Sequence, residues 1–214
     1  MQDATALILQ NTIIAAPPAC PEIKLRLAPD LVAFWEVMEA ALDSEQPPPF
    51  WAHAWVGGQA LARYVLDTPE TVAGRQVLDF GAGCGLVAIA AAMAGAEAVT
   101  ACDIDPMACA VMPMNAGINS VHLDIVAESM LDCDLDAGVV VLAADIWYEL
   151  LFADRMTGWL RRLSARGHTV LVGDRQRKFF PTSGLERLAG YELATSRDTE
   201  SGLSASAGVW RVQP

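Results

Sequence analysis

The stretch Asp79-Phe80-Gly81-Ala82-Gly83-Cys84-Gly85 decides the fold of this chain. It follows the apolar pair Val77-Leu78, which predicts a short buried strand over 77–80, and it precedes an alanine-rich segment at 86–93 that predicts a helix. Glycine at every second position permits a tight turn with positive φ and lets a ligand approach the backbone closely. The stretch therefore predicts a strand–turn–helix unit that can hold a nucleotide at the turn.

Strand and helix patterns alternate along the chain downstream of a proline-rich segment. We expect further strands at 98–102, 121–126, 139–143 and 169–172, helices at 58–66, 108–115, 150–163 and 185–188, and a closing antiparallel pair at 191–196 and 208–212. Pro113 must kink or shorten the helix at 108–115. Alternation of this kind predicts an α/β fold, a Rossmann-like seven-stranded mostly parallel sheet with helices on both faces and the last strand antiparallel.

The N-terminal region has a different pattern. Residues 23–27 alternate like a half-buried strand, and apolar residues recur at helical spacing over 31–42 after a candidate cap at Asp30. Three consecutive prolines, 47–49, then form a stiff linker. We therefore expect a small strand/helix extension at 1–47 and the main α/β domain at 48–214.

Composition limits the class of protein. The 214 residues are 53% hydrophobic, which suits one domain with a large core, and the net charge of −12 opposes nucleic acid as a partner. Five scattered cysteines without a CxxC pair indicate free thiols in a reducing compartment, and the isolated histidines predict no metal site. No signal peptide or membrane-spanning run is visible, so we expect a soluble cytoplasmic protein with no membrane partner.

Two kinds of cofactor compete for the glycine turn. Dinucleotide folds use Gly-x-Gly-x-x-Gly, but Leu86 stands where the third glycine of that pattern belongs. The carboxylate of Asp79, just before the turn, suits the ammonium and sulfonium cations of S-adenosylmethionine and would repel a pyrophosphate. The turn therefore favours S-adenosylmethionine, with a glycine-rich turn that binds nothing as the alternative.

Further cofactor contacts are expected at the ends of the next two strands. Asp103 is placed to accept hydrogen bonds from the ribose hydroxyls, whereas Asp105, before Pro106, fits a helix cap better. Near the third strand end, residues 128–130 leave the adenine contact open. The expected cofactor-binding residues are Asp79, Gly81, Gly83, Gly85, Asp103, Ile104, Ser129 and Trp55.

The reacting end should lie at the end of the strand over 139–143, because ligands of open parallel sheets lie outside the carboxyl ends of the strands. There the sequence reads Ala144-Asp145-Ile146-Trp147-Tyr148-Glu149. A carboxylate can orient a lysine amine, and aromatic rings can contact its ammonium form. The expected catalytic residues are Asp145, Tyr148, Glu149 and Trp147. Alternatively, Asp145 caps a helix and the two aromatic residues pack beneath the closing strands.

Two tryptophans flank His53 just after the prolines. Trp51 and Trp55 can close over the adenosyl group, or they can anchor the N-terminal region to the sheet. A single histidine between aromatic residues is more often structural than an acid or base in catalysis.

Together these residues carry a resemblance to one family. The segment from Pro49 to Leu61, PFWAHAWVGGQAL, resembles the entry segment of the electron-transfer flavoprotein β-subunit lysine methyltransferases. The similar order continues through 77–85, 101–106, 144–149, 172–175, 201–203 and 209–210. The resemblance implies a class I, seven-β-strand methyltransferase that uses S-adenosylmethionine and modifies lysine side chains of the flavoprotein β-subunit.

The resemblance also implies roles for single residues. Asp79, Gly81, Gly83 and Asp103 would bind the cofactor with Trp55 near it, and Asp145 and Tyr148 would face the lysine. Family members carry Asn where this chain has Ser129, so the adenine contact stays open.

Two other functions remain as alternatives. One is a methyltransferase for another protein, such as a ribosomal protein, and the other is a non-catalytic module that binds S-adenosylmethionine. Enzymes that methylate amide or base nitrogens carry Asn/Asp-Pro-Pro-Tyr at this strand end, and Ile146 and Trp147 replace those prolines here. The three acids Asp79, Asp103 and Asp145 are all present, which argues against a non-catalytic module.

Overall fold

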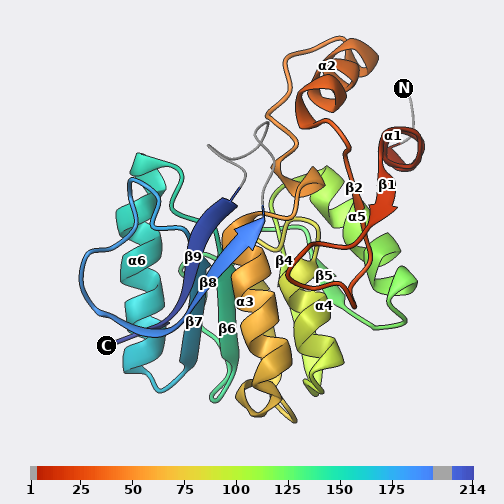
Figure 1. Cartoon of the computed structure of the whole chain (residues 1–214). Coiled ribbons are helices and arrows are strands. Elements are labelled where there is room, and N and C mark those ends of the chain that lie inside the picture. Colours follow the sequence, from red (N-terminus) through yellow and green to blue (C-terminus); the bar gives the residue numbers. More distant parts are fainter. Residues whose placement is uncertain (1–3, 195–203) are drawn as a thin grey trace.

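A seven-stranded sheet forms the centre of the molecule (Figure 1). The structure is a computed structural model that describes residues 4–194 and 204–214. From one edge to the other the strands are β5 (Asp124–Val126), β4 (Ala98–Cys102), β3 (Gln76–Phe80), β6 (Val140–Ala144), β7 (Thr169–Asp174), β9 (Ser204–Val212) and β8 (Leu185–Ala194). The first five are parallel, and β9 runs antiparallel to both β7 and β8. The expected α/β class and the antiparallel last strand are confirmed.

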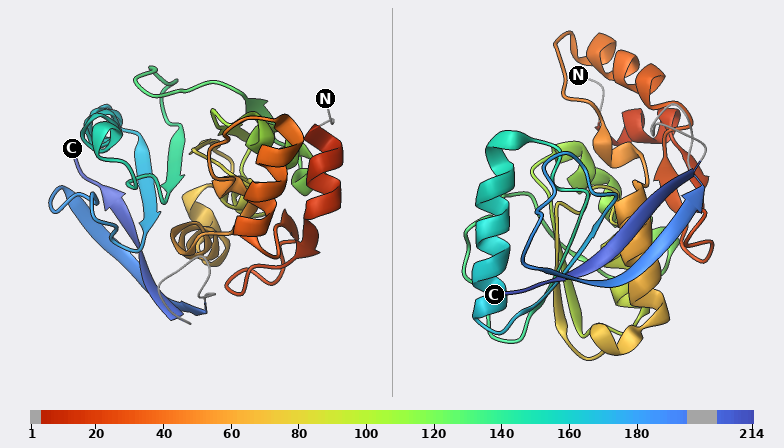
Figure 2. Two further views of the ribbon diagram at one scale, coloured as in Figure 1. Left: turned by 90° about the horizontal axis from the view of Figure 1, so that it is seen from above. Right: turned by 60° about the vertical axis from the view of Figure 1, so that its left-hand side comes forward.

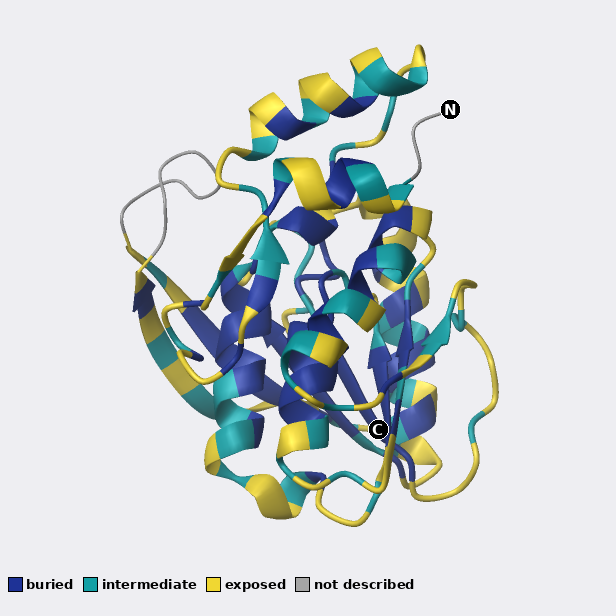
Figure 3. Cartoon of the chain, turned by 90° about the vertical axis from the view of Figure 1, so that its right-hand side faces the viewer, coloured by how far each residue is buried: buried dark blue, intermediate teal, exposed yellow. Residues whose placement is uncertain are grey.

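The two faces of the sheet are covered unequally (Figure 2). On one face α3 (Val56–Asp67), α4 (Leu86–Met93) and α5 (Pro106–Ile118) share a core with alternate residues of the strands. The other face carries α6 (Leu150–Ala165), whose Trp159 and Leu160 pack against the remaining alternate residues. The central strands β3, β6 and β7 are almost entirely buried, whereas the edge strand β8 and the covering helices expose one side (Figure 3).

The chain order reverses between β3 and β6. From β3 the chain passes through α4 to β4 on one side, and β6 pairs with β3 on the other side. A crevice opens outside the carboxyl ends of the strands at such a reversal, and ligands of open α/β sheets bind there. The glycine turn after β3 and the Asp145 segment after β6 both lie at this point.

The N-terminal region packs against α5. It consists of α1 (Ala4–Asn11), a strand pair β1 (Ile13–Ala15) and β2 (Leu25–Leu27), and α2 (Leu31–Leu42). Asn115 of α5 accepts a hydrogen bond from the backbone N–H of Arg26 over 2.8 Å. Leu7, Phe34 and Trp51 share a small core with residues of α5. The boundary after residue 47 remains a prediction, since the extension and the main domain share this core.

Several local predictions are confirmed. Asp30 caps α2 by accepting from the Ala33 N–H over 2.9 Å, and Asp105 caps α5 by accepting from the Met107 N–H over 2.8 Å. The helix at 86–93 and the strand at 98–102 match α4 and β4. Pro113 does not shorten α5, which continues to Ile118.

One predicted helix is wrong, and one α-helix and one strand near the N-terminus were missed. Residues 185–188 begin the strand β8 and form no helix. A register shift between Arg187 and Ala189 interrupts the alternation of β8, which is why its apolar spacing imitates a helical turn. Helix α1 and strand β1 were not predicted, because residues 1–22 are only weakly patterned. Residues 195 and 196, expected in the closing pair, lie outside the described residues.

No helix in the described ranges is long and apolar enough to cross a bilayer. The same residues contain no group of three or more His, Cys, Asp or Glu side chains that could hold a metal ion.

Candidate active site

The glycine turn after β3 is built from left-handed backbone. Gly81, Gly83 and Gly85 have φ of 68°, 53° and 82°. A side chain at these positions would be strained, and a Cβ at Gly83 would lie 3.7 Å from the Cα of Trp51. The turn thus presents backbone to the crevice, as the sequence predicts.

Asp79 supports the turn from below. Its side chain is buried, and its Oδ2 accepts from the Ala88 N–H over 2.8 Å, which caps α4. Gly85 at the start of α4 has no side chain for that task, so a carboxylate from β3 replaces a local cap. Burial raises the pKa of Asp79 to about 7, although the hydrogen bond from Ala88 opposes the shift.

Asp103, after β4, reaches back to the same turn. Its Oδ2 accepts from the Gly83 N–H over 2.8 Å and its Oδ1 from the Asp105 N–H over 3.0 Å. Because Asp105 is engaged as the cap of α5, Asp103 is the acid that faces the turn, as expected. Ile104, beside it, is 73% exposed at the mouth of the crevice.

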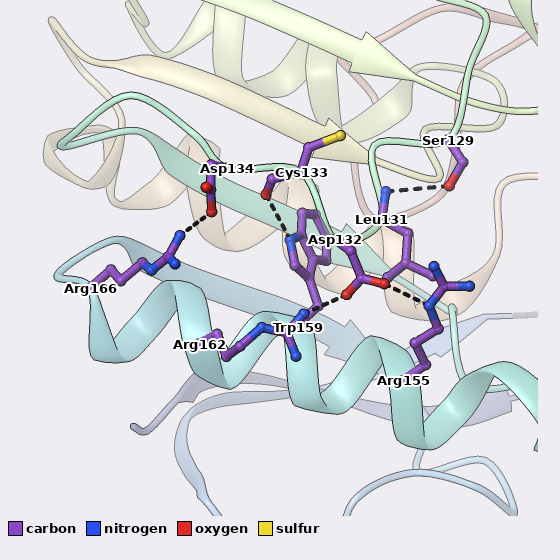
Figure 4. A network of polar contacts seen from close by, with 9 residues as sticks. All are labelled: Ser129, Leu131, Asp132, Cys133, Asp134, Arg155, Trp159, Arg162 and Arg166. Carbon is purple, nitrogen blue, oxygen red and sulfur yellow. Dashed lines mark hydrogen bonds and ion pairs between the residues drawn. The ribbon is translucent and has the colours of Figure 1, made fainter.

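The loop after β5 is tied to α6 by a polar network (Figure 4). Arg155 pairs with Asp132 over 2.6 Å, Arg162 pairs with the same carboxylate, and the indole of Trp159 donates to the Cys133 carbonyl over 3.0 Å. Ser129 lies exposed on this loop, where its hydroxyl accepts from the Leu131 N–H over 3.3 Å. Its contact with adenine remains a prediction.

Asp145, after β6, is held by the first turn of α3. The residue is 9% exposed and has φ of 56°. Its Oδ2 accepts from the Gly58 N–H over 2.8 Å. The amino end of a helix carries partial positive charge, so it stabilises this carboxylate. Asp145 therefore does cap a helix, and that helix is the distant α3 instead of the adjacent α6.

The close approach of α3 to Asp145 and to strand β7 depends on two glycines. A Cβ at Gly57 would lie 2.6 Å from Oδ2 of Asp145 and 2.6 Å from the Gly173 carbonyl oxygen, and a Cβ at Gly173 would lie 2.2 Å from the Gly57 oxygen. This role of Gly57 and Gly173 was not predicted. The adjacent glycines at the start of a helix were its only visible signal.

Arg177 completes the surroundings of Asp145. Its guanidinium pairs with Oδ1 of Asp145 over 2.8 Å and lies 5.3 Å from the centroid of the Trp55 ring. Its backbone N–H donates to Oδ1 of the buried Asp174 over 2.7 Å. Burial and the charge of Asp145 raise the pKa of Asp174 to about 7. No sequence pattern links Asp145 to Arg177, 32 positions apart, so this pair was not foreseen.

The other three predicted catalytic residues differ in position. Trp147 is 1% exposed, donates to the Thr157 hydroxyl over 3.0 Å and packs against Phe180. Its position thus agrees with the alternative interpretation, in which this aromatic side chain is packed in the interior. Tyr148 is 58% exposed, and partial burial, with the nearby charge of Glu149, raises its pKa. Glu149 is exposed at the start of α6. Trp147 and Tyr148 line a hollow of about 470 Å³ together with residues 175–179.

The two tryptophans near His53 have separate positions. Trp51 is buried edge-on against Phe34, 5.6 Å between ring centroids, and anchors the N-terminal region. Trp55 is half-buried, with its indole donating to the Phe50 carbonyl over 2.7 Å, and faces Arg177. Burial lowers the pKa of His53 to about 4, which makes it a weak base.

The residues present fit S-adenosylmethionine. The turn offers backbone without side chains, a carboxylate at Asp103 reaches the turn, and an exposed apolar side chain at Ile104 lies next to it. The predicted cofactor residues from β3 and β4 are thus brought together. Asp79 lies beneath the turn and is not open to the crevice.

The fold and this site define the class of the protein as a class I S-adenosylmethionine-dependent methyltransferase. A family model described as ribosomal protein L11 methyltransferase (PrmA) matches residues 59–170. A solved structure of magnesium protoporphyrin IX methyltransferase from Synechocystis, with bound SAM, shares the fold with a TM-score of 0.52 and 15% identity, covering 73% of this chain and 79% of that one.

Sequence relatives define the family more narrowly. The electron transfer flavoprotein beta subunit lysine methyltransferase of Danio rerio is 41% identical, covering 98% of this chain and 83% of the relative. The Homo sapiens protein of the same name is 37% identical, covering 98% of this chain and 82% of the relative. The chain therefore belongs, within the group matched by the PrmA model, to the electron transfer flavoprotein beta subunit lysine methyltransferase family.

Proposed function

We propose that this chain transfers methyl groups from S-adenosylmethionine to lysine side chains of the beta subunit of electron transfer flavoprotein. The name of its family supports this substrate. The observation that carries the proposal is the buried carboxylate of Asp145, paired with a cation beside the Trp55 ring at the strand next to the glycine turn. A site built in this way suits a lysine ammonium group.

One side of the site binds and orients the cofactor. When bound, S-adenosylmethionine supplies a methyl group on a positively charged sulfur. Gly81 and Gly83 leave room for it against the backbone, and Asp103 can accept hydrogen bonds from ribose hydroxyls. Ile104 offers an apolar surface to the adenine, with Ser129 on the neighbouring loop as the proposed polar contact.

The acceptor side of the site prepares the lysine. An amine with an ordinary pKa of about 10.4 arrives protonated, and only its neutral form has the lone pair that attacks carbon. Asp145 attracts and orients the ammonium, while it also raises the pKa of the amine. The proton therefore leaves to water through the open hollow beside Tyr148. Tyr148 and Glu149 stand at the rim, and Trp147 supports them from below. Alignment then supplies much of the rate.

An exposed apolar surface favours a protein as the substrate. Tyr148, Leu150, Leu151 and Phe152 follow directly after the Asp145 segment, and 46–86% of each is exposed. Contiguous apolar surface of this kind on a folded protein usually marks an interaction site. We propose that the flavoprotein subunit covers these residues when its lysine enters.

The match to the ribosomal L11 methyltransferase model supports a second candidate, a ribosomal protein as substrate. We favour the flavoprotein because its family aligns with nearly the whole chain, whereas that model matches 59–170. Methylation of purified L11 but not of the flavoprotein would reverse this preference.

We also propose a cytoplasmic location and no nucleic-acid partner. All five cysteines are free thiols, which suits a reducing compartment. The net charge of −12 repels phosphate backbones.

The test is methyl transfer from labelled S-adenosylmethionine to recombinant electron transfer flavoprotein, with Asp145→Asn as the control. This variant keeps the shape of the side chain and its acceptor for the Gly58 N–H, so α3 stays capped. We expect label on beta-subunit lysines with the wild type and a large loss with Asp145→Asn, at unchanged cofactor affinity. Label on another protein of a whole extract, with none on the flavoprotein, would overturn the substrate and leave the class intact.

A further inference from the structure

A cation from the chain itself occupies the site where the proposed mechanism needs the substrate lysine. The guanidinium of Arg177 lies 2.8 Å from Oδ1 of Asp145 and 5.3 Å from the centre of the Trp55 ring. A carboxylate on one side and an aromatic face on the other are the two contacts that recognise an ammonium group. We propose that Arg177 occupies the acceptor position as a stand-in for the lysine, and that the incoming lysine displaces it. This inference rests on the proposed lysine methyltransferase function.

Burial explains why a cation must remain at this position. The side chain of Asp145 is 8% exposed and that of Arg177 is 19% exposed. Removal of one partner of a buried ion pair is costly, so loss of Arg177 from this position would destabilise the protein unless another cation replaces it. Exchange of the guanidinium for a lysine ammonium keeps the charge at this position unchanged.

The anchoring of Arg177 allows its side chain to move alone. Its backbone N–H is held by the buried Asp174 over 2.7 Å, which fixes the main chain at this point. Residues 175–179 line the open hollow of about 470 Å³, so the guanidinium can rotate towards solvent without movement of β7. The displaced side chain leaves by the opening through which the lysine enters.

Displacement makes Arg177 a competitor of the substrate. When a site is competent in only a fraction of the molecules, its apparent affinity falls by that fraction. If the closed arrangement outnumbers the open one by about ten to one, removal of the guanidinium improves the apparent affinity by about ten-fold. A purely structural Arg177, which only orients Asp145, predicts the opposite, because its removal would misplace the carboxylate.

The first experiment compares Arg177→Met with Arg166→Met. Both variants remove one positive charge and keep an unbranched apolar stem. Arg166 follows the far end of α6 and pairs with Asp134, away from the site. We expect Arg177→Met to lower KM for the flavoprotein and to strengthen binding of n-butylammonium in calorimetry, with Arg166→Met like the wild type. A higher KM or unchanged butylammonium binding in folded Arg177→Met would overturn the proposal.

The second experiment places an amine at the position itself. The chain has two lysines, Lys24 and Lys178, so methylation at a third site is easily resolved by mass spectrometry. In Arg177→Lys the neutral amine at position 177 can form a bond to the methyl carbon as the carbon–sulfur bond breaks. The sulfur keeps the bonding electron pair, and the amine proton goes to water.

The position of the label in Arg177→Lys decides the second experiment. With S-adenosylmethionine and no protein substrate, we expect label at position 177, none at Lys24 or Lys178, and loss of label when Asp145→Asn is added. If Arg177→Lys still methylates the flavoprotein but carries no label at 177, the position is not the acceptor site. If the wild type fails on the flavoprotein while position 177 is labelled, the substrate assignment fails and the acceptor position stands.

Discussion

The adjacent glycines at the start of α3 should respond in opposite ways to alanine. At Gly57 a Cβ would lie 2.6 Å from Oδ2 of Asp145 and 2.6 Å from the Gly173 carbonyl oxygen. At Gly58 the nearest atom is 3.9 Å away, an ordinary contact. Both positions lie within the same helix, so helix propensity changes equally in the two variants.

The expected change in the free energy of unfolding follows from these distances. Overpacking costs about 1–3 kcal/mol, and loss of the hydrogen bond from Gly58 to a charged carboxylate costs about 1.5–3 kcal/mol. The higher helix propensity of alanine offsets about 1 kcal/mol of this cost. Gly57→Ala should therefore lower the free energy of unfolding by about 2–5 kcal/mol, whereas Gly58→Ala should leave it unchanged or raise it by up to about 1 kcal/mol.

Thermal unfolding followed by circular dichroism checks both variants. At about 2–4 °C per kcal/mol for a chain of this size, Gly57→Ala should lower Tm by at least about 4 °C. Its kcat/KM should also fall, by up to about 100-fold, because the shift misplaces Asp145. A Gly57→Ala protein that melts like the wild type, or equal destabilisation of the two variants, would refute the reasoning about close approach at α3.

Three further predictions concern single carboxylates. Asp103→Ala should weaken binding of S-adenosylhomocysteine in calorimetry by about ten-fold or more, since a hydrogen bond to a charged group contributes about 1.5–3 kcal/mol; unchanged affinity would remove Asp103 from the cofactor site. The pKa of Asp79 is about 7 in the folded protein against an ordinary 3.8, so the folded state binds its proton more tightly and the free energy of unfolding falls as pH rises through that window. Asp79→Asn should flatten this fall in denaturant titrations, and an identical pH profile would contradict the assignment. Asp30→Ala removes the cap of α2 and should cost about 1 kcal/mol in urea unfolding, with an unaltered midpoint as the contrary result.

Most of the fold could be predicted from local patterns in the sequence. The alternation of strands and helices determined the class, because a buried parallel strand and an amphipathic helix each leave their period in the chain. Short-range chemistry was equally readable: Asp30 and Asp105 cap the helices that follow them. Only residues 185–188 of β8 were misread, as a helix, because a register shift between Arg187 and Ala189 interrupts the alternation there.

The cofactor half of the site was also visible in the sequence. Gly81, Gly83 and Gly85 take the left-handed backbone that their spacing implies, and Asp103 faces the turn, because these residues lie at adjoining ends of neighbouring strands. The burial of Asp79 beneath the turn was not visible, since its partner Ala88 comes from the next helix.

The acceptor half was decided by the tertiary structure. The sequence by itself determined that a carboxylate and aromatic residues follow β6. Only the packing of α3 against β7, through Gly57 and Gly173, places the amino end of a helix on Asp145. Only the return of the chain after β7 brings Arg177 between Asp145 and Trp55. Such contacts join residues 32 to 122 positions apart, so no local period or spacing encodes them, and they form when buried charge and close-packed backbone have to be satisfied together.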